Sequence, residues 1–276
     1  MQILKQLFNF YLNSSIHVAL AVYALSWVTL ETFNIAYDEN VLYFNFYATI
    51  TGYNFVKYFG VAKFHHRSLT TWLKVIQVFS LVCFILLCYY ALQLETKILF
   101  YIAGFALITF LYAIPFLPKR IYMDSQHNLR NISGLKVYII ALVWSGVTVL
   151  IPLMNNSVTI NADVWIMLFQ QYIYVIVLML PFEIRDLRYD SLKLSTIPQK
   201  IGVKRTKFFG VFLLIIFFLL EFLKDELTHQ LVWIRFIITI VTGLFLIFAN
   251  KKRSNYYSSF WVESIPVFWL LIFIIS

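Results

Sequence analysis

Long apolar stretches, each about as long as a bilayer is thick, recur along the whole of this chain of 276 residues. A transmembrane helix needs roughly 20 consecutive and mostly apolar residues. Charged residues make up only 13% of the chain, against about a quarter in soluble globular domains. We therefore expect an all-α, polytopic membrane helix bundle with nine transmembrane helices. The nine stretches lie near residues 15–34, 41–62, 75–94, 96–115, 136–154, 164–182, 207–223, 231–249 and 258–276.

The basic residues predict how this bundle is oriented. When successive loops are assigned to alternate sides of the membrane, one side receives all but three of the 22 Lys and Arg residues. The exceptions are Lys97, Lys224 and Arg235. Because basic loops stay in the cytoplasm, we expect a multi-pass protein of the cell membrane with a cytoplasmic N-terminus and, after nine spans, a C-terminus on the opposite side. The net charge of +9 is thus interpreted as topology, and no nucleic-acid partner is expected.

The longest polar connections are all on the predicted cytoplasmic side, at about residues 63–74, 116–135 and 183–206. No Gly- or Ser-rich linker divides the chain. We therefore expect a single transmembrane domain over residues 1–276, whose functional site is reached from the cytoplasm.

An acidic stripe follows the sixth predicted helix. If that helix continues through Asp190, then Glu183, Asp186 and Asp190 fall within a sector of roughly 60°, with Arg185 and Arg188 on the far side. Neighbouring like charges repel, so a positive group is expected against the stripe. One interpretation is a divalent cation, most simply Mg²⁺, which the carboxylates bind and which bridges to a phosphate. The other is a membrane-boundary helix whose acids pair with Lys and Arg of the loops.

The run from residue 183 to 202 resembles the second aspartate motif of the UbiA superfamily of intramembrane prenyltransferases. That motif reads roughly D-x-x-D-x-x-x-D, followed by T-L-P and a glycine. Glu183 stands at the position of the first aspartate, and the matching residues are Asp186, Asp190, Thr196, Pro198 and Gly202. The segment Leu-Tyr-Ala-Ile-Pro-Phe-Leu-Pro-Lys-Arg at 111–120 is similar to the family's Y-S-x-P-P-x-x-L-K-R, and residues 141–146 are similar to the W-G pattern of its fifth helix.

The resemblance covers essentially the whole chain. It implies nine helices, a cytoplasmic N-terminus and an internal repeat of four-helix units. In this chain the two units would be about 15–115 and 136–249, followed by a ninth helix at 258–276.

The family's first motif, which ends the second helix, is degenerate in this chain. Asn54 matches its first position, but Tyr58 and Ala62 stand where the family has aspartates. Asn54, Lys57, Tyr58 and His65 share one helical face, which is basic where the family is acidic. In one account, the Lys57 ammonium replaces a metal and contacts a diphosphate. In the opposing account, Lys57 pairs with Asp186 or Asp190 and neutralises a site that no longer does chemistry.

The resemblance implies a transferase that moves an isoprenoid chain from a prenyl diphosphate to an aromatic or other lipophilic acceptor at the cytoplasmic face, with Mg²⁺ as cofactor. The expected catalytic residues are Asp186, Asp190 and Lys57. The expected diphosphate-binding residues are Asn54, Lys57, Arg67, Tyr112, Lys119 and Arg120. The expected metal ligands are Glu183, Asp186 and Asp190. A non-catalytic isoprenoid- or lipid-binding membrane protein of the same fold is the alternative, and a transporter ranks behind both because the helices lack matching Gly/Pro breaks.

Overall fold

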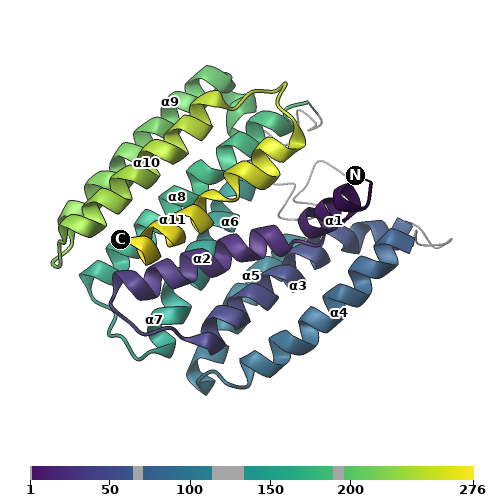
Figure 1. Cartoon of the computed structure of the whole chain (residues 1–276), viewed down its shortest axis with the longest axis horizontal. Helices are drawn as coiled ribbons and strands as arrows, with labels where there is room; N and C mark the ends of the chain where they lie inside the picture. Colours follow the sequence, from purple (N-terminus) through teal and green to yellow (C-terminus); the bar gives the residue numbers. More distant parts are fainter. Residues whose placement is uncertain (1, 65–70, 114–133, 189–195) are drawn as a thin grey trace, which may run out of the picture.

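The computed structural model describes residues 2–64, 71–113, 134–188 and 196–276, and every regular element in these ranges is helical (Figure 1). The elements are α1 Gln2–Asn13, α2 Ile16–Thr32, α3 Glu39–Phe64, α4 Thr71–Ala91, α5 Thr96–Ala113, α6 Lys136–Ser145, the π-helix η3 Gly146–Leu150, α7 Ile151–Asn155, α8 Ala162–Asp186, α9 Ile197–Leu219, the 3₁₀-helix η5 Leu220–Leu223, α10 His229–Phe248, the π-helix η6 Tyr257–Val262 and α11 Ile265–Ile275. The predicted all-α class is confirmed.

The expected count of nine membrane spans is not confirmed by the described residues. Within the described ranges, six helical segments are long and apolar enough to cross a bilayer, or seven if α1 and α2, which are bent by 53°, form one span. A helix lies at each of the nine predicted stretches, but α5 is a shorter apolar helix and α3 carries Asn45, Asn54 and Lys57 along its length. The multi-pass membrane architecture is supported, and the count of nine is not confirmed.

Helix α8 forms the centre of the bundle. In its most apolar window 67% of the residues are buried, against 17% in α4. Figure 1 shows α4 at one edge and α9 and α10 at the other, with α2, α8 and α11 between them. The exposed side chains of α4 and α10 include large apolar residues such as Leu81 and Ile247, and apolar surfaces of this kind suit contact with lipid.

Helix α8 ends at Asp186, four residues before the predicted end at Asp190. The backbone N–H of Leu187 still bonds to the carbonyl oxygen of Glu183, at 3.2 Å, and the chain then turns. The guanidinium of Arg188 donates to the carbonyl oxygen of Arg253, at 2.8 Å, which directs this turn toward the segment before η6. The predicted single helical stripe of three acids is therefore interrupted after its second member, and Asp190 lies outside the described residues.

The T-x-P and glycine of the 183–202 run shape the start of α9. Thr196 is the N-cap of a capping box, in which its backbone N–H bonds to the Gln199 side chain at 3.0 Å, and Pro198 lies in the first turn, where a missing N–H costs nothing. Gly202 interrupts the helix with φ 79° and ψ 158°, a conformation that is essentially restricted to glycine.

Replacing Gly202 with alanine is expected to destabilise the protein by about 1–3 kcal/mol, because a Cβ strains this backbone conformation even though open space surrounds it. Gly104→Ala is the matched control: its added Cβ also meets open space, and in a regular helix alanine is favoured over glycine by about 0.5–1 kcal/mol. Thermal unfolding in detergent measures both variants. Equal melting temperatures would contradict the strained geometry at Gly202.

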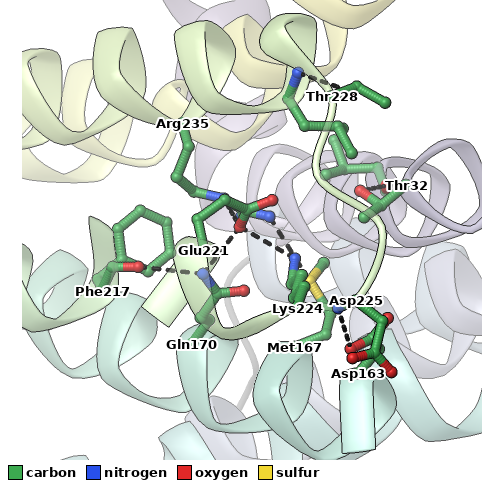
Figure 2. A network of polar contacts seen from close by, with 12 residues as sticks. Thr32, Asp163, Met167, Gln170, Phe217, Glu221, Lys224, Asp225, Thr228 and Arg235 are labelled. Carbon is green, nitrogen blue, oxygen red and sulfur yellow. Dashed lines mark hydrogen bonds and ion pairs between the residues drawn. The ribbon is translucent and has the colours of Figure 1, made fainter. Parts of the chain in front are cut away.

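A buried charge cluster joins α8, η5 and α10 (Figure 2). The Nε of Arg235, the Nζ of Lys224 and the Nε2 of Gln170 each lie 2.9 Å from the same oxygen, Oε2 of Glu221. Arg235 also lies over the ring of Trp269, 4.7 Å from its centroid. These four polar side chains are at most 6% exposed, so Glu221 and Arg235 do not reach out to the membrane surface but form an ion pair inside the bundle.

Lys224, one residue beyond the α9–η5 span, gives this cluster a pH dependence. Burial, and then the charge of Arg235, lower the pKa of Lys224 to about 8, although Glu221 and Asp163 act in the opposite direction. Between pH 8 and 10.5 the unfolded chain therefore binds more protons than the folded one, so the free energy of unfolding is expected to rise with pH in this window. Chemical unfolding at pH 7.5 and 9.5 (roughly the two sides of that pKa) measures the rise, and Lys224→Met should remove it.

Candidate functional site

The first part of the candidate site is the kink between α1 and α2. Ser15 adopts a left-handed conformation there, with φ 65°, and is fully buried. The side chain of Asn54 on α3 holds this kink in place: its Oδ1 accepts from Ser15 Oγ at 2.8 Å, and its Nδ2 donates to the carbonyl oxygen of Ser14 at 3.0 Å and to Ser80 Oγ at 2.8 Å. The amide of Asn54, an expected diphosphate ligand, is thus engaged in joining α2, α3 and α4.

Lys57 lies one turn further along α3 and is connected to the same kink. Its Nζ donates to Ser15 Oγ at 2.9 Å. Its charge also interacts with that of Glu263, which lies between η6 and α11. The neighbouring Tyr58, which stands at an expected aspartate position, donates its hydroxyl to the carbonyl oxygen of Asn13 at 3.0 Å. In the described part of the chain, no ion pair joins Lys57 to Asp186.

Arg185 and Asp186, at the end of α8, form the opposite part of the site. Arg185 Nε lies 2.7 Å from Asp186 Oδ1, and its Nη1 donates to Ser258 Oγ of η6 at 2.8 Å. The charge of Arg185 acts on Glu263 as well. Lys57 of α3 and Arg185 of α8 therefore both act electrostatically on Glu263, which relates the two predicted halves of the site to one acidic side chain.

Glu263 is the residue that the sequence analysis does not place in the site. An acid inside a membrane span is costly and is by default a functional signal, and that signal was present in the ninth apolar stretch. Nothing in the sequence, however, indicates which helices pack against this stretch. The structure packs α11 against α2, and Glu263 is influenced by the charges of Lys57 on α3 and Arg185 on α8.

Glu183, an expected metal ligand, is only 3% exposed. Its carboxylate accepts a hydrogen bond from the backbone at the start of α9. The backbone N–H of Ile197 donates to Glu183 Oε2 at 3.3 Å. A carboxylate at a helix N-terminus satisfies a free backbone donor and is favoured by the helix dipole. The carboxylates of Glu183 and Asp186 therefore have different partners, although both lie on the last turn of α8.

The remaining expected site residues are only partly described. Tyr112 is buried near the end of α5, 6% exposed. Tyr53, one turn before Lys57, accepts a hydrogen bond from Trp144 Nε1 at 3.0 Å, which ties α3 to α6. The residues that lie outside the described ranges are Arg67, Lys119, Arg120 and Asp190.

A magnesium ion does not fit the described residues by themselves. Across residues 2–64, 71–113, 134–188 and 196–276, no three His, Cys, Asp or Glu side chains are grouped so as to bind one metal ion. Glu183 bonds to the α9 backbone and Asp186 bonds to Arg185. What the described site offers is a pair of cations, Lys57 and Arg185, held in place by hydroxyl and carboxylate groups, and cations so arranged can bind the phosphate groups of a ligand.

Comparison with known proteins supports the fold rather than a particular activity. No family model matches the chain, and no curated protein matches it in sequence. Among solved structures, one of digeranylgeranylglyceryl phosphate synthase in membranes matches 98% of both chains, with a TM-score of 0.58 and 17% sequence identity. The chain therefore shares the fold of this synthase over nearly its whole length.

Proposed function

We propose that this protein is a membrane prenyltransferase that transfers an isoprenoid chain from a prenyl diphosphate to an aromatic or other lipophilic acceptor at the cytoplasmic membrane face. The observation that carries the proposal is the position of two cations, Lys57 bonded to Ser15 on one side and Arg185 bonded to Asp186 at the end of α8 on the other. The fold that the chain shares with a membrane prenyltransferase supports the same class of reaction. Fold alone does not fix function, so the charged site is the stronger support.

The proposed reaction begins with cleavage of the bond between the allylic carbon and the diphosphate oxygen. The electron pair leaves with the diphosphate, and the prenyl chain becomes a carbocation. Lys57 and Arg185 stabilise the charge that develops on the leaving group, and the apolar bundle keeps water away from the carbocation. The acceptor then attacks the carbocation and loses a proton, which forms the new bond to the prenyl chain.

Asp186 has a positioning role in this proposal. Its Oδ1 fixes Nε of Arg185 at 2.7 Å, which leaves the Nη groups of the guanidinium to contact Ser258 and a ligand. With Asp190 it also remains the proposed place for Mg²⁺, which would neutralise charge on the diphosphate. No step above depends on the metal.

A non-catalytic isoprenoid- or lipid-binding protein is the second candidate, and one observation favours it. The side chains of Asn54 and Tyr58 form hydrogen bonds within the protein, with Ser14, Ser15, Ser80 and Asn13. The first of the two aspartate motifs is thus replaced by contacts within the protein.

Membranes that contain the protein, incubated with labelled farnesyl or geranylgeranyl diphosphate and a panel of aromatic and lipid acceptors, separate the two candidates. The proposed transferase yields a prenylated product, and Asp186→Asn should lower its formation by about 100-fold or more. The assay is run with and without Mg²⁺. The control is Lys97→Gln, which removes a charge from an exposed ion pair with Glu95 and should leave turnover unchanged. Binding of the diphosphate without product for any acceptor would support the binding protein instead.

A further inference from the structure

A second charged feature lies at the end of α10, and Glu263 is not among the residues that line it. It is a pocket of about 440 Å³ formed by the start of α9, the last turn of α10 and the residues that follow it. The residues that line it are Lys207, Ile247, Phe248, Ala249, Asn250, Lys252 and Arg253. Three of the seven are cations, and none of these lining residues is an acid.

The cations are only partly used by the protein itself. Lys207 Nζ donates to the carbonyl oxygen of Ile247 at 2.6 Å, and Arg253 Nε to that of Phe248 at 3.4 Å. These contacts suit a helix C-terminus, where basic groups meet free carbonyls. Each uses one donor, however, so the ammonium keeps two N–H groups and the guanidinium keeps four. Within the described ranges, the side chain of Lys252 has no partner.

A third feature of the pocket is its apolar surroundings. Ile247 and Phe248, which line it, are 50% and 59% exposed, and Phe208, next to Lys207, is 75% exposed. Because α10 is a candidate membrane span that ends at Phe248, the cations lie where the hydrocarbon gives way to headgroups. A ligand that fits both parts carries an anionic head and long apolar tails.

We infer that this pocket binds the phosphate of an anionic phospholipid, whose acyl chains lie along the exposed apolar surface of α9 and α10. Basic pockets between membrane helices bind anionic headgroups in this way. Free phosphate shares the head chemistry but has no tails, so it should bind more weakly. The inference is separate from the proposed prenyl transfer, because it uses none of the residues around Glu263.

The test uses the full-length protein purified in a neutral detergent. Native mass spectrometry counts the lipid retained during titration with phosphatidylglycerol, with phosphatidylcholine and with inorganic phosphate in separate arms. We expect phosphatidylglycerol to bind preferentially, and Lys252→Gln with Arg253→Gln to weaken it by about 30-fold, since each cation near an anionic headgroup contributes about 1 kcal/mol. High salt should weaken the binding as well.

The matched control is Lys74→Gln with Lys136→Gln, which removes the same charge from the starts of α4 and α6. If both double variants lost the same amount of phosphatidylglycerol binding, the lipid would be attracted by overall charge and the inference would be overturned. Equal retention of phosphatidylglycerol and phosphatidylcholine would overturn it as well, because the pocket would then not select an anionic headgroup. Saturation by inorganic phosphate at the same concentration would overturn the lipid assignment. The single variant Lys252→Gln, whose side chain makes no described contact, repeats the measurement without risk to the fold.

Discussion

Glu221→Ala is expected to destabilise the folded protein by about 3–5 kcal/mol, since removal of one partner leaves uncompensated charge inside the bundle. Lys224 and Arg235 both lie 2.9 Å from Glu221 Oε2 and are at most 6% exposed. Without the carboxylate, two buried cations face each other with no anion between them. The melting temperature in detergent and the fraction of monodisperse protein on size-exclusion chromatography measure the loss.

The exposed ion pair between Lys97 and Glu95 supplies the control. Its two side chains are 59% and 44% exposed, so Glu95→Ala should cost less than about 1 kcal/mol. Replacing Glu221, Lys224 and Arg235 together with leucine should restore much of the stability that Glu221→Ala loses, because apolar residues often substitute for a whole buried ion cluster at little cost. If Glu221→Ala and Glu95→Ala shifted the melting temperature equally, the buried cluster would not be stabilising α8, η5 and α10.

Apolar length predicted the helices of this protein well, because a chain in lipid must satisfy its backbone within each segment. The count of nine spans that this measure predicted is not confirmed. In α3 the apolar run is interrupted by Asn45 and Asn54, whose side chains bond to α2 and to other parts of the bundle. Such residues are tolerated because a neighbouring helix supplies their hydrogen-bond partner. The mean hydropathy of a segment does not show which helix lies next to it.

The site shows the same division between local and long-range information. The sequence analysis identified Thr196 and Gly202 only as motif matches, and the structure shows that they form a capping box and a helix interruption. Periodicity placed Glu183 and Asp186 on one turn, yet it could not show that the former bonds to the α9 backbone and the latter to Arg185. Likewise, Glu263 interacts electrostatically with Lys57 and Arg185, which are distant in the sequence. The partner of each charge depends on helix packing, which the sequence pattern does not specify.

Lys57→Gln and Glu263→Gln are expected to change the affinity for farnesyl diphosphate in opposite directions. Lys57 is a proposed donor to the diphosphate, and a charged hydrogen bond contributes about 1.5–3 kcal/mol, so its loss should raise Kd by about tenfold or more. The charge of the Glu263 carboxylate acts on Lys57 and Arg185, so we expect it to compete with the diphosphate for these cations. In Glu263→Gln the neutral amide no longer competes, so both cations should bind the diphosphate and the Kd for farnesyl diphosphate should fall. Equilibrium binding of labelled farnesyl diphosphate to the purified protein measures both effects.

Farnesol, which has the same tail and no charge, separates electrostatics from folding. Its affinity should be the same in the parent protein and in both variants, because the tail is expected to lie among apolar side chains rather than beside Lys57. A parallel loss of farnesol binding would show that the variants disturb the bundle, and Lys57 also holds Ser15 at the α1–α2 kink. If Glu263→Gln bound the diphosphate more weakly but farnesol equally well, the proposed competition would be contradicted. The Glu263 carboxylate would then help to position Lys57 and Arg185 for the ligand. Because binding is measured without turnover, this result applies equally to a transferase and to a non-catalytic isoprenoid carrier.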